Sequence, residues 1–343
     1  MHVDLPLMSD MHVHLRQGVM LRNVAQWTGS CCSHCLVMPN TVPSVATAAD
    51  VASYRTEVVE AFKHYPHCKP LMTFKLSPST TADKVMAMRG LTVAGKLYPE
   101  GVTTNSGDGI SRKILERPHD YPNFMDALGA MEQAGMVLCL HGEMPDEFCM
   151  DREVQFYEFV RWVLLQYPKL RVVLEHITDY RSVRFMRVWG DERFTATITA
   201  HHLRLTLDDV VGDKLNPHNF CKPVAKHPAD RTALLEAATS GDPRFFLGSD
   251  SAPHPISDKE CAAGCAGVFS APVLPELLTT IFEEQGALPH LEAFTSVNGN
   301  RFYGLPQPTE TIRLERESWQ VPDLCNSNVV PFLADQTLPW RFS

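Results

Sequence analysis

The clearest structural signal in the chain is residues 137–176, which read VLCLHGEMPDEFCMDREVQFYEFVRWVLLQYPKLRVVLEH. Two short apolar runs, VLCL at 137–140 and VVL at 172–174, enclose an amphipathic stretch over 151–167 that stops at Pro168. Continuous apolar runs of this length are typical of strands buried on both faces, and the stretch between them is typical of a helix. This stretch therefore predicts a strand, a helix and a second strand.

The same alternation extends along most of the chain. With the region of His12, the further apolar runs bring the number of predicted strands to eight, and they lie at 35–38, 71–74, 93–97, 195–198 and 245–247. Further helices are predicted over 47–64, 229–239 and 273–285. One more begins with Asn123 as its cap and ends at Gly135.

Eight strands alternating with helices predict an α/β fold, a (β/α)8 TIM barrel. An open doubly wound sheet is the alternative. We expect one domain over 1–343, with the barrel at about 1–305 and a short C-terminal extension at about 306–343. That extension holds one strand-like piece, 311–314, among prolines.

Composition limits the class of protein. Hydrophobic residues make up 44% of the 343 residues and charged residues 21%, as in ordinary globular proteins. The formal net charge is −9, with no basic run, which argues against nucleic acid or an anionic membrane surface as partner. No secretory signal and no long apolar span is visible, so we expect a cytoplasmic protein.

Ionisable side chains stand at the ends of the predicted strands, where barrel enzymes carry their chemistry. The first strand ends in His12-Val13-His14, and alternate residues of a strand share a face, so both imidazoles can grip one metal ion. Later strands end near Lys96, His141, His176 and Asp250. We interpret this set as a metal site.

Lys96 is unusual in such a set because an ammonium repels a cation. A partly buried lysine loses its proton more easily, and the neutral amine can react with carbon dioxide to form a carbamate that bridges two cations. The alternative for Lys96 is a salt-bridged rim lysine.

The remaining histidines and the ten cysteines are interpreted as structural. We expect His201 and His202 to be satisfied core or rim residues, and His34, His64 and His67 to be surface positions. The cysteine clusters at 31–35 and 261–265 are irregularly spaced. Buried or loop thiols are therefore favoured over a zinc knuckle.

Together these residues resemble the amidohydrolase superfamily, and within it most closely dihydroorotase. The resemblance runs from about residue 8 to about residue 335. It rests on the motifs DMHVHLR at 10–16, VMPN at 37–40, KLYP at 96–99, LHGE at 140–143, EHIT at 175–178, GSDSAPH at 248–254 and SVNG at 296–299. Because the metal motif lies near the start of the sequence, we expect no N-terminal half of a β-sandwich. In this respect the chain is similar to the short dihydroorotases, which are typically homodimers.

The resemblance implies two zinc ions bridged by carboxylated Lys96 and a hydroxide. His12, His14 and Asp250 would hold one ion, and His141 and His176 the other. Asp250 would also be the catalytic proton carrier in the interconversion of dihydroorotate and N-carbamoyl-aspartate. This small-molecule reaction belongs to pyrimidine biosynthesis.

The resemblance also implies a set of substrate contacts. Arg16 would bind the substrate carboxylate, because it follows His14 by two residues on the same strand face. The other implied contacts are Asn40, His254, the backbone near Ala266, and the lid residues Thr103 and Thr104. The alternative for the segment 101–107 is a solvated turn.

Three positions depart from the family pattern. Gln17 replaces an acidic residue, Lys222 adds a positive charge near the substrate where an apolar residue is expected, and the segment 106–109 differs in the lid. Two other functions stay open: a hydantoinase-like or allantoinase-like enzyme, and a scaffold subunit without catalysis. The complete metal set argues against the scaffold.

Overall fold

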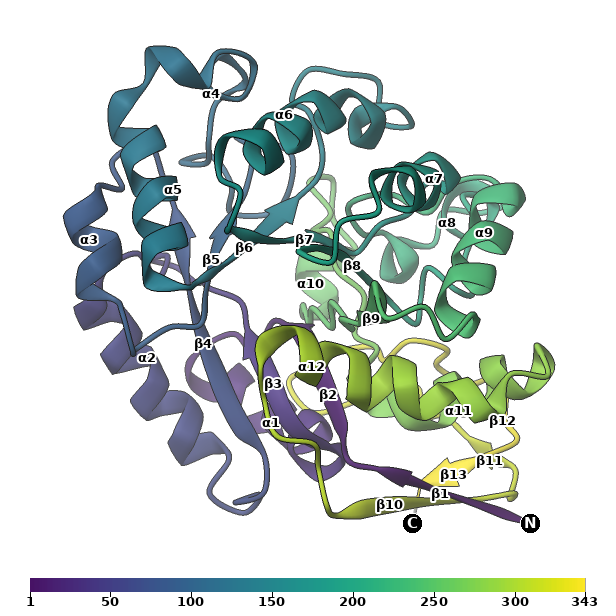
Figure 1. Cartoon of the computed structure of the whole chain (residues 1–343). Helices are drawn as coiled ribbons and strands as arrows, with labels where there is room; N and C mark the ends of the chain where they lie inside the picture. Colours follow the sequence, from purple (N-terminus) through teal and green to yellow (C-terminus); the bar gives the residue numbers. More distant parts are fainter. Residues whose placement is uncertain (343) are drawn as a thin grey trace.

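Eight parallel strands, paired in chain order, form the centre of the computed structural model, which describes residues 1–342 (Figure 1). Each strand lies beside the next strand along the chain, without the reversal of order that an open doubly wound sheet has. The TIM barrel is therefore confirmed and the open doubly wound sheet is wrong. All eight predicted strands are present. They are β2 (Met8–Val13), β3 (Cys32–Val37), β4 (Lys69–Leu76), β5 (Ala94–Leu97), β6 (Val137–His141), β7 (Arg171–Glu175), β8 (Phe194–Ile198) and β9 (Phe245–Leu247).

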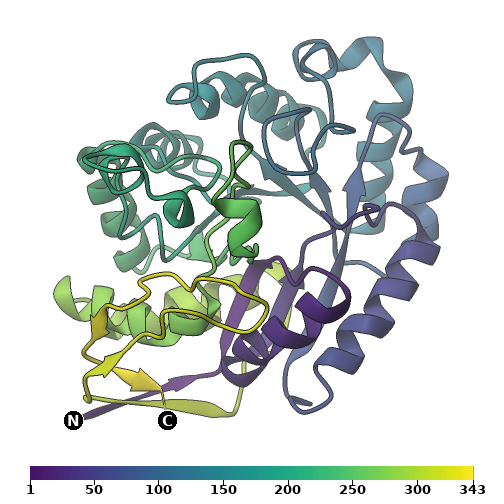
Figure 2. The ribbon, with the colours of Figure 1, turned by 180° about the vertical axis from the view of Figure 1, so that it is seen from behind.

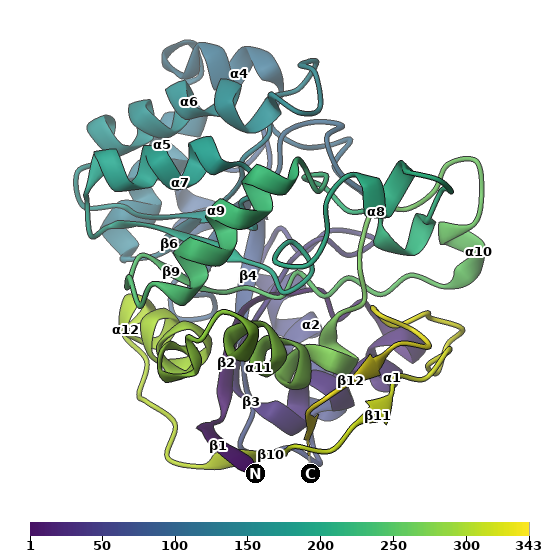
Figure 3. The ribbon, with the colours of Figure 1, turned by 90° about the vertical axis from the view of Figure 1, so that its right-hand side faces the viewer.

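Helices surround the strands (Figures 1 and 3). The longer ones are α1 (Gly18–Cys31), α2 (Ala48–Ala61), α5 (Pro122–Ala134), α6 (Arg152–Gln166), α7 (Tyr180–Trp189), α9 (Pro228–Thr239) and α11 (Leu274–Glu284). The shorter ones are α3 (Ala82–Ala87), α4 (Arg112–Glu116), α8 (Asp208–Val211), α10 (Ile256–Lys259) and α12 (Asn298–Tyr303). Within residues 1–342, no helix is long and apolar enough to cross a membrane.

The predicted helices are confirmed, with one wrong boundary. Helix α5 begins at Pro122, whose missing N–H and fixed φ suit a first turn, so Asn123 lies inside the helix and does not cap it. The helix ends as expected at Gly135, which has a φ of 70°. In α2, Thr47 and Asp50 form a reciprocal capping box.

The apolar core has an inner and an outer part. Inside the barrel, small and large side chains such as Met11, Ala94, Val173 and Phe246 pack together and fill its interior. A larger cluster lies between the strands and the helices. The barrel is therefore a packed core rather than an open channel.

The two ends of the chain meet in a small antiparallel sheet. Strand β1 (His2–Pro6) pairs with β10 (Thr311–Glu315), and β10 pairs with β13 (Arg341–Phe342), as the view from behind shows (Figure 2). The short strands β11 (Trp319–Gln320) and β12 (Thr337–Leu338) pair beside α11 (Figure 3). The strand predicted at 311–314 is confirmed, whereas β1 was not predicted.

Glu276 of α11 makes the packing of this C-terminal segment sensitive to pH. One carboxyl oxygen accepts a hydrogen bond from Phe342 N at 3.3 Å, and the other has no partner among residues 1–342. Burial raises the pKa of Glu276 from 4.5 to about 7. The protonated carboxyl therefore stabilises the fold at low pH, and this stabilisation is lost as the pH rises through 7.

We predict that Glu276→Gln becomes more stable relative to the wild type as the pH rises from 5 to 8. The change should be roughly 2–3 kcal/mol, because one pKa unit corresponds to about 1.4 kcal/mol. Urea unfolding at both pH values measures it. The exposed variant Glu292→Gln is the control and should follow the wild type. An equal stability difference at both pH values would contradict the prediction.

Candidate active site

The predicted site residues lie together in one pocket at the carboxyl end of the barrel. All but two of them line it: His12, His14, Arg16, Asn40, Thr103, Thr104, His141, His176, Lys222, Asp250 and Ala266. Lys96 is fully buried on β5, and His254 contacts Arg16. Parallel strands deliver their ends to the same rim, which is why residues from six different strands meet here.

His12, His14 and Asp250 form one candidate metal-binding group. Their ligand atoms all lie within 4.8 Å of one another, and all three residues are buried. Asp250 Oδ1 is 3.2 Å from His14 Nε2 and 3.4 Å from His12 Nε2. Two ligands of one tetrahedral zinc ion are separated by roughly 3.4 Å, so the spacing suits such an ion.

His141, His176 and Lys96 lie beside this first group. The ring centres of His141 and His176 are 4.8 Å apart, and those of His176 and His12 are 5.0 Å apart. His12 Nε2, His176 Nδ1 and Lys96 Nζ are buried and have no hydrogen-bond partner within the described part of the chain. Buried polar atoms normally have partners, so these atoms fit the role of metal ligands.

The protonation states agree with a metal site. Burial lowers the pKa of His14 to about 4 and lowers the pKa of His141 and of His176, which leaves neutral imidazoles with a lone pair. Burial also lowers the pKa of Lys96. For Asp250, burial alone would raise the pKa, but the hydrogen bond with His14 and the neighbouring imidazoles hold it well below its usual value.

Two buried carboxylates, Glu175 and Glu143, hold two of the histidines through one ring nitrogen each. Glu175 Oε2 lies 2.9 Å from His12 Nδ1 and accepts a hydrogen bond from Thr197 Oγ1 at 2.6 Å. Thr197 Oγ1 in turn accepts from the backbone N–H of His176 at 2.6 Å. Glu143 Oε2 is 2.6 Å from His141 Nε2. Such partners fix the ring orientation, and they leave His12 Nε2 and His141 Nδ1 for an ion.

The backbone at the rim is bent out of its usual conformations. Arg16, His176 and Asp250 have φ values of 61°, 41° and 44°, in the left-handed region that non-glycine residues rarely adopt. Each such residue costs of order 1–3 kcal/mol. Strand β2 ends at Val13, so the predicted shared strand face of His14 and Arg16 is wrong: Arg16 reaches the pocket through this turn.

Arg16 and His254 form a hydrogen-bonded pair at the pocket. Arg16 Nε donates to Pro253 O at 2.9 Å, and its terminal nitrogen donates to His254 Nε2 at 2.8 Å. Burial lowers the pKa of His254 to about 2, so its neutral ring accepts this bond through Nε2 and carries its hydrogen on Nδ1. Gln17 turns away from Arg16 and accepts from Val42 N at 3.1 Å.

The segment 101–110 lies over the pocket. Asn40 Nδ2 donates to Thr104 O at 3.1 Å, and Thr104 Oγ1 donates to Ala266 O at 3.4 Å. A buried lysine of β4, Lys75, pairs with Asp108 and donates to Asn105 O at 3.0 Å. The departure noted at 106–109 therefore supplies the acidic partner of Lys75.

Another buried lysine, Lys259, holds the backbone next to the pocket. Lys259 Nζ donates to three backbone oxygens, those of Phe220, Cys265 and Gly267, at 2.9, 2.9 and 2.6 Å. These bonds hold the backbone on both sides of Ala266. Lys222 also lines the pocket, as the sequence predicted.

Several residues of this site were not predicted from the sequence. Tyr98 lines the pocket with its ring 5.2 Å from Lys96 Nζ, and Glu143, Glu175, Lys75 and Lys259 act behind the ligands or the loops. In the sequence, these residues could have been noticed only because each has an ionisable side chain within or next to a predicted strand or a family motif. His34, expected at the surface, is 5% exposed, so that prediction is wrong.

Comparison with known proteins identifies relatives along the whole chain, although no family model matches. A curated dihydroorotase of Aromatoleum aromaticum is 42% identical over 341 residues, which cover 97% of this chain and 96% of that protein. A crystal structure of dihydroorotase from Saccharomyces cerevisiae, in complex with 5-fluoroorotic acid, superposes with a TM-score of 0.91 at 34% identity. It covers 100% of this chain and 98% of that one.

A more distant likeness shows the fold alone. The L-hydantoinase of Arthrobacter aurescens has a TM-score of 0.80 but only 14% identity, over 99% of this chain and 82% of that one. The dihydroorotases of Aromatoleum aromaticum and Saccharomyces cerevisiae, by contrast, share enough sequence identity with this chain, over nearly the full length of both proteins, to show a common family. The chain belongs to the dihydroorotase family of the amidohydrolase superfamily, whose members depend on metal ions.

Proposed function

We propose that this protein interconverts L-dihydroorotate plus water and N-carbamoyl-L-aspartate, in pyrimidine biosynthesis. The observation that carries the proposal is the position of Arg16 and His254, an anion-binding corner, in the same pocket as the histidines and Asp250. A cyclic amide with a carboxylate can place its carboxylate on Arg16 and its ring amide over the metal ligands. Hydantoin and allantoin have no carboxylate to satisfy this corner.

We propose two zinc ions as the cofactors, bridged by carboxylated Lys96. His12, His14 and Asp250 would hold one ion, and His141 and His176 the other. Support comes from the buried nitrogens without partners and from the lowered pKa of Lys96, which makes the amine available to carbon dioxide. Bound zinc would supply a water of lowered pKa and would polarise the carbonyl under attack.

Asp250 is the proposed catalytic residue. Its carboxylate oxygen, ionised at neutral pH, accepts the proton of the attacking water and passes it to the amide nitrogen as the ring C–N bond breaks. In the reverse direction, Asp250 takes the proton from the carbamoyl nitrogen as the ring C–N bond forms and gives it to the oxygen that leaves as water. The fixed position of Asp250 between His12 and His14 keeps it within reach of both partners.

The other pocket residues bind and cover the substrate. Arg16, Asn40 and His254 take the carboxylate, and the backbone at Ala266 takes the ring amide. Lys222 adds a positive charge to the wall. Thr103 and Thr104 close over the ring and exclude water.

The assembly and the organisation of the chain are part of the same proposal. We infer one domain, with the barrel at about 1–305 and the extension at about 306–343. We further infer a homodimer that acts in the cytoplasm on small molecules. Size-exclusion chromatography with light scattering measures the oligomeric state.

The first test is an activity panel. The protein, supplied with zinc and bicarbonate, should hydrolyse dihydroorotate, followed by the loss of its ultraviolet absorbance, and should leave hydantoin and allantoin intact. Asp250→Asn keeps an oxygen ligand but cannot carry the proton, so kcat should fall by roughly 10²–10⁴-fold. The exposed variant Asp213→Asn should retain full activity. No turnover of dihydroorotate with two zinc ions bound per chain would refute the proposal.

The bridging lysine has a test that does not depend on turnover. Protein loaded with zinc in ¹³C-bicarbonate should show one carbamate carbon signal per chain by NMR, because burial lowers the pKa of Lys96 and the two proposed cations would stabilise a carbamate there. Lys96→Met should lose both the signal and most of the bound zinc. Lys222→Met is the matched control and should keep both. A carbamate signal that persists in Lys96→Met would show that another lysine is modified.

The contact between Lys75 and the lid predicts a KM effect. Lys75→Met removes the partner of Asp108 and the donor to Asn105, so the closed lid loses stability and KM for dihydroorotate should rise several-fold. The zinc content should not change. Asp108→Asn should show a smaller effect in the same direction, since its side chain is 65% exposed and its ion pair is screened. Equal KM values in all three proteins would exclude this role.

A further inference from the structure

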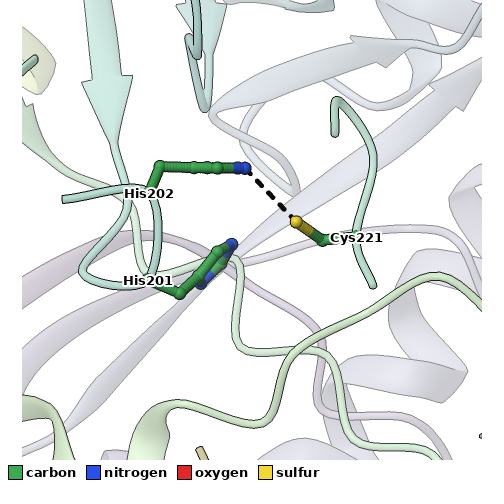
Figure 4. A group of neighbouring side chains, drawn as sticks. All are labelled: His201, His202 and Cys221. Atoms are coloured by element: carbon green, nitrogen blue, oxygen red, sulfur yellow. Dashed lines mark hydrogen bonds between the residues drawn. The ribbon is translucent and has the colours of Figure 1, made fainter. Parts of the chain in front are cut away.

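A second group of possible ligands lies outside the proposed catalytic centre. His201 and His202 follow strand β8, and Cys221 lies in the segment before α9 (Figure 4). All three side chains are buried, with exposed fractions of 0%, 1% and 1%. Two turns of the chain, about twenty residues apart, thus bring two imidazoles and a thiol to one place.

The spacing of this group suits a metal ion. One ligand atom of each residue lies within 4.8 Å of those of the other two, and His202 Nε2 is 3.2 Å from Cys221 Sγ. A zinc ion bound at about 2.0–2.1 Å by nitrogen and about 2.3 Å by sulfur separates two such ligands by roughly 3.5 Å. Small side-chain rotations would therefore bring all three onto one ion.

The hydrogen bonds leave the group incomplete without an ion. His202 Nδ1 lies 2.9 Å from Thr199 Oγ1. Its Nε2 lies 3.2 Å from Cys221 Sγ and 3.1 Å from Pro223 O, so an ion would replace the contact with Pro223. His201 is the unexplained member: neither ring nitrogen has a hydrogen-bond partner within residues 1–342. The expectation that His201 is a satisfied core residue is therefore wrong. A fully buried imidazole without a partner is rare, and an ion would satisfy it.

The chemistry of the donor set selects the ion. Two neutral imidazoles and one thiolate suit zinc, whereas hard ions such as magnesium prefer oxygen. Burial raises the pKa of Cys221 to about 12, so the group is a thiol until a cation displaces its proton into solution. The nearby trio His254, Asp258 and Cys265 is a weaker candidate because His254 is already bonded to Arg16 and Asp258 is exposed.

We propose that His201, His202 and Cys221 bind one further zinc-type ion per chain, with a fourth position open to water. The ion would join the turn after β8 to the segment that carries Lys222, and so would hold one wall of the active-site pocket. The proposal does not depend on the reaction that the pocket catalyses.

Cobalt substitution tests the proposal, because the residues proposed for the catalytic centre include no cysteine. Full-length protein, produced with cobalt as the only added transition metal, should show a near-ultraviolet thiolate-to-cobalt band. It should also bind one cobalt more per chain than the catalytic centre holds. Cys221→Ser and His201→Asn should lose the band and the extra ion, whereas Cys139→Ala and Cys265→Ser should keep both.

X-ray absorption of the wild-type zinc protein gives a second readout that needs no variant. We expect an average of one sulfur ligand for every three zinc ions. A sulfur-free zinc environment, or no thiolate band at saturating cobalt, would overturn the proposal. So would a band that survives Cys221→Ser or that disappears in Cys139→Ala or Cys265→Ser. These results are read independently of dihydroorotate turnover.

Discussion

The active end of this barrel depends on the seam between its first and last strands. Strands β2 and β9 meet only near the rim, where Asp250 N donates to His12 O at 2.8 Å and His14 N donates to Ser251 O at 3.1 Å. The buried carboxylate of Asp10 accepts from Ser249 N at 2.8 Å and locks the same junction. The bonds that close the barrel are therefore the bonds that place Asp250 between His12 and His14.

The seam also explains a backbone constraint beside the site. A Cβ on Gly248 would lie 2.7 Å from the Thr197 side chain and 2.9 Å from His12 Cβ. A side chain there would push His12 or Thr197 out of position. Thr197 belongs to the hydrogen-bond network of Glu175 and His176, so one crowded point of the seam affects two proposed ligands, His12 and His176.

Burial is the main cause of the shifted pKa values of the site residues. The same desolvation that keeps His14, His141 and His176 neutral makes Lys96 easier to deprotonate, while Asp250 stays ionised because of its hydrogen bond with His14 and the neighbouring imidazoles. The chain has a net charge of −9, yet its pocket wall carries Arg16 and Lys222, with Lys75 and Lys259 behind the loops. Cationic side chains gathered at one site of an otherwise negative protein suit a small anion better than a polyanion.

The sequence by itself determined the fold and most of the candidate site. Strands buried on both faces leave a readable apolar run, and the proposed metal ligands lie at or near the ends of such runs, so this part of the rim could be predicted from linear position. The tertiary structure alone decided which groups stand behind the ligands: Glu175 behind His12, Glu143 behind His141, Lys75 under the lid and Lys259 behind Ala266. It also decided that Arg16 reaches the pocket through a left-handed turn, that His34 is buried, and that His201 meets Cys221. The physical reason is that periodicity reports only which face of an element is buried, whereas a hydrogen bond between residues far apart in the chain exists only after the barrel has closed.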